Sequence, residues 1–187
     1  MRFVSALCTA AFMATLTPAL AEDHKFLGQP ITMENLVDVL EIQRVTTNLT
    51  LAVDTAQWDV VADLLQPELE TTIGEPVNAP SVMKTEDEIL ARWKGFYESA
   101  ERIVIHHVTS NERVFFNDAD NADLFAKGVI VLENTPAGEF AEDGGMLRGS
   151  RWVNYEFGVT RTDAGWKVNK VNVEYLVQEF ESFPPAN

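Results

Sequence analysis

The chain has 187 residues, a single cysteine and a formal net charge of −15 at neutral pH. Because nucleic acids and anionic membrane surfaces would repel it, this charge argues against both as partners and favours neutral or cationic ligands. The length allows one domain with a sizeable core and is too short for two of ordinary size.

The first 21 residues have the pattern of a secretory signal peptide. The basic residue Arg2 precedes an almost unbroken apolar run over 3–16, and residues 18–21 (Pro-Ala-Leu-Ala) form an A-x-A cleavage pattern. The run is shorter than a membrane span. We expect cleavage after residue 21, export across the inner membrane to the periplasm, and no membrane anchor in the mature protein. The alternative is an uncleaved N-terminal anchor.

The only cysteine, Cys8, lies inside this segment, so the mature chain would have none. It would then form no disulfide and offer neither a thiolate nucleophile nor a cysteine-based zinc site. Export without disulfides fits a bacterial periplasm better than a eukaryotic secretory route. Residues 22–30 are predicted to be a flexible lead-in to a domain over 31–182, with a short tail at 183–187.

Residues 31–65 are predicted to be helical, with a corner at 54–57 between two helices. Trp58 opens the second, shorter helix, and Pro67 ends it. Apolar residues recur on one stripe of this segment, as expected for a helix with one buried face: Leu36, Val39, Leu40, Val45, Leu49, Ala52 and Val53.

A capping box predicts a third helix, after a short strand candidate at 69–74 and a proline-punctuated loop. Thr85 is followed three residues later by Glu88, the pattern in which each side chain bonds the backbone N–H of the other. The helix is expected to run to about Ser99. Its inner face would carry Ile89, Trp93, Phe96 and Tyr97.

From residue 103 onward the pattern is that of a β-sheet. Residues 117–120 and 162–165 are predicted to be hairpin turns. Helices followed by an antiparallel meander are the α+β pattern, with the helices packed on one face of a curved sheet. The acidic, glycine-rich residues 136–147 are predicted to form a mobile loop at a cavity mouth or subunit edge. Four runs rich in Val, Ile, Phe and Tyr have strand length: 103–116, 122–133, 149–161 and 166–178.

Asp54 and His107 are the candidate catalytic residues. A carboxylate that orients and charges a histidine is the smallest apparatus for general-base catalysis. Strict alternation sends His106 and His107 to opposite faces of their strand, and we take His107 as the inward one. Two other interpretations stay open: a core histidine bonded to a backbone carbonyl, and Asp54 as a helix cap, a role for which Asp59 competes.

Arg151 is a candidate for substrate binding, because it shares a strand face with the apolar residues that follow it. A guanidinium on such a face must be paired or near water, so Arg151 is placed to hold an anionic or carbonyl oxygen. The alternative is a side chain that extends from the strand end to solvent. Four aromatic residues are candidates for substrate contact, with core packing as the alternative: Trp58, Trp93, Tyr97 and Tyr155.

No set of histidines and acidic residues has the spacing of a metal site, so we predict no metal. The chain also lacks a G-x-S-x-G motif, a glycine-rich phosphate loop and a dinucleotide-binding fingerprint. We therefore expect a protein that needs no cofactor.

Four segments in order carry a family resemblance: residues 51–59 (LAVDTAQWD), Glu88-Ile89 with Trp93, residues 107–116 (HVTSNERVFF) and residues 163–168 (DAGWKV). In this order they resemble the SnoaL-like branch of the NTF2-like superfamily, over roughly residues 33–180. The resemblance implies a cone-shaped α+β fold, in which N-terminal helices pack on a curved, mostly antiparallel sheet and enclose a pocket.

This branch includes scytalone dehydratase, hexachlorocyclohexane dehydrochlorinase, polyketide cyclases and small subunits of ring-hydroxylating dioxygenases. In the two lyases a histidine on this strand acts as general base and an aspartate at this helix corner orients it, and these positions match His107 and Asp54. Scytalone dehydratase also uses tyrosines and a second histidine. Here Val53 replaces one such tyrosine, and aliphatic residues replace the second histidine, which argues against dehydration of scytalone itself.

The leading hypothesis is a cofactor-independent lyase or isomerase that acts on a small, neutral or apolar, cyclic molecule. One alternative is a non-catalytic periplasmic binding or accessory domain. Another is an assembly module in which the outer face of the sheet forms a homodimer or homotrimer and buries outward residues such as Phe116 and Trp152.

Overall fold

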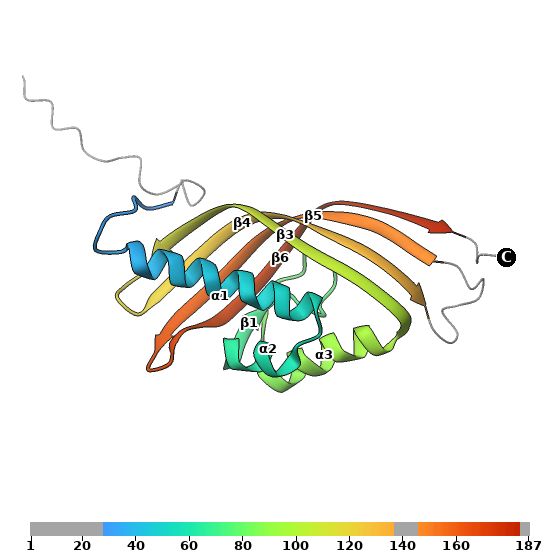
Figure 1. Ribbon diagram of the computed structural model, residues 1–187, viewed down its shortest axis with the longest axis horizontal. Helices are drawn as coiled ribbons and strands as arrows, with labels where there is room; N and C mark the ends of the chain where they lie inside the picture. Colours follow the sequence, from blue (N-terminus) through green and yellow to red (C-terminus); the bar gives the residue numbers. More distant parts are fainter. Residues whose placement is uncertain (1–27, 137–145, 184–187) are drawn as a thin grey trace, which may run out of the picture.

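The computed structural model describes residues 28–136 and 146–183, which form helices followed by a curved, open six-stranded sheet (Figure 1). The predicted signal peptide, most of the lead-in, most of the loop over 136–147 and most of the tail lie outside the described residues. The elements are α1 (Leu36–Asp54), α2 (Trp58–Leu64), β1 (Leu65–Thr71), β2 (Val82–Thr85), α3 (Glu86–Glu98), β3 (Ala100–Phe116), β4 (Asn121–Pro136), β5 (Met146–Thr162) and β6 (Gly165–Phe183).

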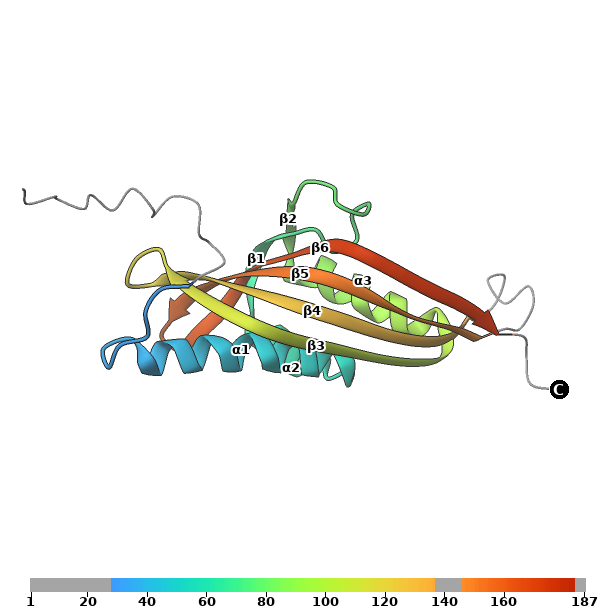
Figure 2. The ribbon, with the colours of Figure 1, turned by 90° about the horizontal axis from the view of Figure 1, so that it is seen from above.

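The α+β prediction is confirmed. The strand order is β2-β1-β6-β5-β4-β3, so β3 is an edge strand, and β1 runs parallel to β6 while the other pairs are antiparallel. Figure 1 shows β3–β6 arching over the three helices, and from above they run side by side along the length of the molecule (Figure 2). The helices therefore cover the concave face of the sheet.

The buried stripe of α1 largely follows the prediction, although Leu36 is only half-buried and Thr46 is buried as well. Leu40 is exposed, and Ile42 is fully buried instead. The core consists of this stripe and the concave face of the long strands, with Leu124, Val153 and Phe157 among its buried residues. The stripe follows the helical period of 3.6 residues, which carries Ile42 to the core side and Leu40 away from it.

Pro67 does not end a helix, as we expected, but lies inside β1, which begins at Leu65 rather than at residue 69. The pairing of β1 with β6 is irregular between Leu65 and Glu70, and β2 joins only from Glu68. Pro67 therefore lies where no regular ladder needs its missing N–H, which is the place where a strand tolerates proline.

The predicted capping box is confirmed at the start of α3. The Thr85 side chain accepts from the backbone N–H of Glu88 at 3.3 Å, and the Glu88 carboxylate accepts from the backbone N–H of Thr85 at 2.8 Å. These bonds satisfy N–H groups that the helix itself leaves unpaired. The helix ends at Glu98, within one residue of the expected position.

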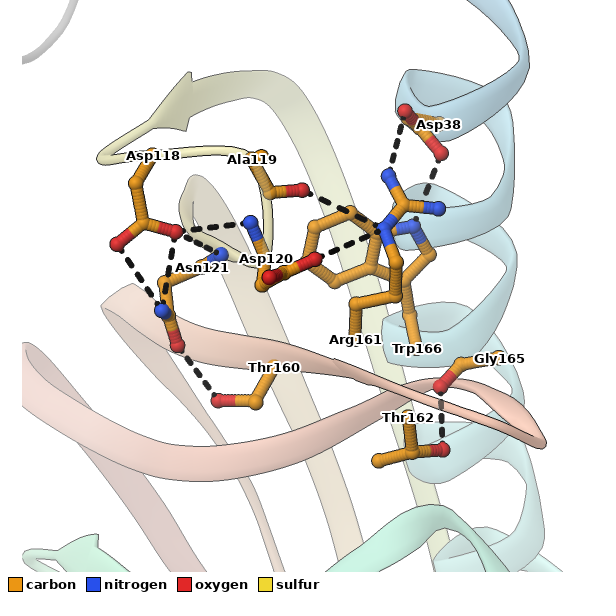
Figure 3. Close-up of polar contacts among 10 residues, drawn as sticks. All are labelled: Asp38, Asp118, Ala119, Asp120, Asn121, Thr160, Arg161, Thr162, Gly165 and Trp166. Carbon is orange, nitrogen blue, oxygen red and sulfur yellow. Dashed lines mark hydrogen bonds and ion pairs between the residues drawn. The ribbon is translucent and has the colours of Figure 1, made fainter.

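Arg161 connects the N-terminal half of α1 to two hairpin turns (Figure 3). Its guanidinium pairs with Asp38 of α1 at 2.7 Å, lies 3.6 Å from the Asp120 carboxylate, and stacks over the Trp166 ring at 4.4 Å. The Trp166 indole N–H donates to Asp38 at 3.2 Å. Hydrogen bonding from Arg161, and then from Trp166, lowers the pKa of the Asp38 carboxyl.

The outer face of the sheet carries an apolar row that crosses four strands. Val108, Val129, Trp152 and Val177 are direct register partners on β3, β4, β5 and β6. Trp152 is 53% exposed. The prediction that Phe116 also faces outward is wrong, because its side chain packs against the core with its ring 6.3 Å from that of Trp166.

Candidate active site

Asp54 and His107 meet at the edge of the sheet. Because β3 is an edge strand, backbone groups on its outer side are not used by a neighbouring strand, and α1 packs there. Asp54 is the last residue of α1. One carboxylate oxygen accepts from the backbone N–H of His107 at 2.8 Å, and the other contacts the His107 Nδ1. The two side chains are 7% and 14% exposed, so the pair is largely shielded from water.

This contact fixes which ring nitrogen of His107 is basic. Nδ1 faces a carboxylate, so in the neutral ring Nδ1 carries the hydrogen and Nε2 keeps its lone pair. No hydrogen bond among the described residues involves Nε2, and the ring lines a cavity. Asp54 therefore holds the His107 ring at the cavity wall, whereas the neighbouring His106 is exposed.

The helix-cap interpretation of Asp54 does not describe this arrangement. The cap position of α2 is Gln57, which has no side-chain cap hydrogen bond, and Asp59 lies within the first turn. Both Asp54 oxygens are directed to His107 instead.

The cavity next to His107 lies between α1, α3 and the concave face of the sheet and has a volume of about 190 Å³. Its walls are mainly apolar and aromatic, which suits a small organic molecule. Besides His107, the lining includes Leu49, Val53, Ile73, Trp93, Phe96, Tyr97, Ile105, Ile130, Leu132, Arg151, Tyr155, Phe157, Val171, Val173 and Tyr175.

Tyr97 joins α3 to the last turn of α1. Its hydroxyl donates to the Val53 carbonyl at 2.6 Å, beside Asp54, and its ring meets that of Trp58 edge to face at 5.2 Å. Burial, and then the charge of Asp54, raise the pKa of the Tyr97 phenol, so it remains a donor. Trp58 does not line the cavity. It packs against Tyr97, which does line it. Trp93 lines the cavity directly.

Tyr155 is 4% exposed, and its hydroxyl has no hydrogen-bond partner among the described residues. Its ring lies 6.4 Å from that of His107. A Cβ on Gly128 would come within 2.5 Å of the Tyr155 ring, so a glycine on β4 makes room for this ring. Burial first, and then the charges of Tyr175 and Asp54, raise the pKa of the Tyr155 phenol.

Arg151 lies in the same row of the sheet as the histidine. His107 is the register partner of Ile130, and Ile130 is that of Arg151. The guanidinium carbon lies 5.2 Å from the Tyr175 ring centre and 5.1 Å from that of Phe180. The Arg151 Nε is buried and has no described partner, so this group does not extend freely into solvent.

Tyr175 is a cavity residue that sequence reasoning missed. Strand β6 has an irregularity between the partners of Trp152 and Val153, where Leu176 is an extra residue. This bulge follows Tyr175, so it does not disturb the alternation that runs from Val173 to Tyr175. Two signals could therefore have found Tyr175: its aromatic character and its place two residues after the buried Val173, on the same face of the strand.

The described part of the chain gathers no group of three or more His, Cys, Asp or Glu side chains that could hold a metal. Within the same residues, no helix combines the length and apolar character needed to cross a membrane.

Three solved structures illustrate the similarity in fold. A hexachlorocyclohexane dehydrochlorinase (LinA) type 2 is 18% identical, with a TM-score of 0.61 over 82% of this chain and 92% of its own. The LinA type 3 enzyme of Novosphingobium barchaimii LL02 is 17% identical, with a TM-score of 0.60 over 79% and 92%. A candidate scytalone dehydratase from Novosphingobium aromaticivorans DSM 12444 is 18% identical, with a TM-score of 0.56 over 80% and 91%.

Comparison with curated protein sequences found no match. The model of the SnoaL-like domain family, in contrast, matches residues 34–172, which include both Asp54 and His107. With the family match and the shared fold, the chain belongs to the SnoaL-like family and has the NTF2-like fold of these solved structures.

Proposed function

We propose that this protein is a cofactor-independent lyase or isomerase in which His107 is the general base and Asp54 orients it. The observation that carries the proposal is the two-point contact of Asp54 with His107 at the wall of an apolar cavity. The names of the structural neighbours, dehydrochlorinase and candidate dehydratase, are those of lyases and favour the same class of reaction.

The mechanism follows from the orientation of the ring. The Nε2 lone pair removes a proton from a carbon atom of a substrate held in the cavity, and the ring becomes an imidazolium. The Asp54 carboxylate stabilises this positive charge through Nδ1. The proton can then be returned to another carbon, which is an isomerisation, or transferred to a leaving group, which is an elimination.

The substrate in this proposal is a small, largely apolar, cyclic molecule, since the cavity is mostly apolar and about 190 Å³ in volume. The sequence of residues 1–21 supports export to the periplasm as the setting of the reaction.

The test is a screen for proton abstraction. Small cyclic ketones and β-hydroxy ketones are incubated with the protein in deuterated water, and deuterium uptake and loss of water are followed by NMR. On any compound that reacts, His107→Ala should lower turnover about 10²–10⁴-fold, the usual contribution of a placed general base. Asp54→Asn should also lower it.

The matched control is His106→Gln, because this neighbour is exposed on the opposite face of the strand and should leave turnover unchanged. A loss below tenfold for His107→Ala would contradict the mechanism. Ligand binding that survives Asp54→Asn, without turnover of any compound, would favour the non-catalytic binding domain.

We also propose that the outer face of the sheet associates with a second copy of the chain. The observation that favours it is the apolar row of Val108, Val129, Trp152 and Val177 across four neighbouring strands. Contiguous apolar side chains on the surface of an acidic protein are typical of an interaction site.

A further inference from the structure

The cavity contains two buried donors that lack an acceptor. In the described part of the chain, the Arg151 Nε and the Tyr155 hydroxyl are the buried side-chain donors without a hydrogen-bond partner, and both residues line the cavity of His107. A buried donor left unpaired is costly, and native structures rarely contain one without a reason. The missing acceptor is therefore expected on the molecule that fills the cavity.

The position of these donors relative to the base restricts what that molecule can be. Arg151 and His107 lie in one row on the inner face, separated by Ile130, which places their Cα atoms two strand spacings or roughly 10 Å apart. The Tyr155 ring lies 6.4 Å from the His107 ring. Because Arg151, Tyr155 and His107 line one cavity, a small substrate can reach the donors with an oxygen while a neighbouring carbon faces His107.

The charge of Arg151 indicates what kind of acceptor is favoured. Its guanidinium makes no ion pair with a carboxylate among the described residues, and it lies over the rings of Tyr175 and Phe180. A partly buried positive charge is most stable next to a negative one, and aromatic faces supply only part of that compensation. The acceptor that best suits Arg151 is therefore a substrate oxygen that carries a negative charge or gains one during the reaction.

We infer that the substrate is a carbonyl compound whose oxygen is held by the Arg151 Nε–H and the Tyr155 hydroxyl, with the adjacent C–H directed at His107. This inference rests on the proposed function and adds the substrate class and the group that stabilises the intermediate. The raised pKa of the Tyr155 phenol agrees with its role as a donor, because the phenol stays protonated.

The proton balance of the step is complete within the site. His107 Nε2 takes the proton from the carbon next to the carbonyl, the electron pair of that C–H bond forms the carbon–carbon double bond of an enolate, and the carbonyl π pair moves to oxygen. Arg151 and Tyr155 stabilise the charge on that oxygen. The oxygen pair then re-forms the carbonyl. In a β,γ-unsaturated compound the imidazolium gives its proton to the γ-carbon as the double bond moves to the α,β position, whereas in a β-hydroxy compound the Cβ–O bond breaks, the α,β double bond forms and the imidazolium protonates the leaving hydroxide to water.

The experiment uses 4-nitrophenol, a planar mimic of a cyclic enolate whose neutral and ionised forms have different absorption spectra. Affinities of both forms for the full-length protein are measured by titration at several pH values. Because charge-assisted hydrogen bonds are the stronger ones, the wild type should bind the phenolate about tenfold or more tightly than the phenol. Arg151→Gln should reduce this preference to about threefold or less, and Tyr155→Phe should reduce it in part.

Three controls separate this inference from the proposed function. Lys127→Gln removes one positive charge from the exposed face of the adjacent strand and should leave the preference intact. His107→Ala should also keep it, since that variant removes the base and leaves the oxygen site. Arg151→Lys keeps the charge without Nε and should show an intermediate preference, which provides a second test if Arg151→Gln does not fold.

Equal binding of phenol and phenolate by the wild type would overturn the inference, as would a preference that survives Arg151→Gln. An equal loss in Lys127→Gln would also overturn it, because the effect would then be general electrostatics. Tight binding of benzoate without a preference for the phenolate would mean that Arg151 holds a carboxylate already present on the substrate, which contradicts the enolate assignment.

Discussion

Asp54 reaches His107 at two points because β3 is the free edge of the sheet and α1 ends beside it. The backbone N–H of His107 would be unpaired without the carboxylate. The same group therefore satisfies an edge-strand donor and orients the ring. Asp54 thus pairs an edge-strand N–H, which the fold requires, and holds the His107 ring, which the proposed mechanism requires.

Gly128 leaves the space that the ring of Tyr155 occupies. A methyl group at Gly128 would lie 2.5 Å from the Tyr155 ring. Gly128→Ala should lower the free energy of unfolding by about 1–3 kcal/mol, as overpacking of a core usually does. The measurement is urea unfolding of the wild type and the variant.

The control for this prediction is Gly95→Ala in α3, where an added Cβ meets no heavy atom within 4 Å. That change should stabilise the protein by about 0.5–1 kcal/mol, since alanine is the better helix former. In a Tyr155→Leu background the cost of Gly128→Ala should become smaller. An identical cost in both backgrounds would show that the clash with Tyr155 is not its cause.

Single residues were predictable where a local rule determines their orientation. Alternation along β3 separates His106 from His107 without knowledge of the fold. It could not show that Asp54 contacts His107, because that contact joins residues 53 positions apart. Alternation would also have placed Tyr175 on the inner face, because it lies two residues after the buried Val173 and before the bulge at Leu176.

Helix starts and hairpin turns were predictable from the sequence, because neighbouring residues form the hydrogen bonds that define them. The capping box at Thr85 and the two hairpin turns were predictable from a few adjacent residues. The parallel pairing of β1 with β6 was not, because it joins segments about a hundred residues apart. The long strands β3–β6 extend beyond their predicted ends. Backbone pairing with a long neighbouring strand continues past the point where apolar residues stop recurring in the sequence.

The attachment of α1 to the β5–β6 hairpin through Asp38 and Arg161 should make stability depend on pH. The pKa of Asp38 is lowered in the folded protein, so its stabilising effect is present above the ordinary carboxyl pKa and is lost as pH falls through the lowered value. At neutral pH, Asp38→Asn should reduce the free energy of unfolding by about 1 kcal/mol.

The check is urea unfolding of wild type and Asp38→Asn at neutral pH and in acid. The difference between the two proteins should shrink as pH falls, because the wild-type carboxyl then becomes protonated as well. A difference that is constant with pH would mean that the ion pair with Arg161 does not contribute.

At the scale of the whole molecule, the two faces of the sheet have different roles in this account. The concave face forms the core and the cavity, and the outer face carries the apolar row. If this row joins two copies, sedimentation velocity should show a dimer, and Trp152→Glu should convert it to a monomer.

Leu40→Glu is the matched control, because Leu40 is similarly exposed on α1, away from the outer face of the sheet. It should leave the dimer unchanged. A wild-type protein that stays monomeric at all concentrations tested would contradict the proposed association.

The proposed mechanism requires that Asp54 hold His107 with Nε2 free to accept a proton. Its most direct test is the ¹⁵N NMR spectrum of the His107 ring, recorded with the ring neutral, in the wild type and in Asp54→Ala, with His106→Gln to assign the signals. Hydrogen should be on Nδ1 in the wild type, and this preference should be lost in Asp54→Ala. Hydrogen on Nε2 in the wild type, or an unchanged spectrum in Asp54→Ala, would contradict it.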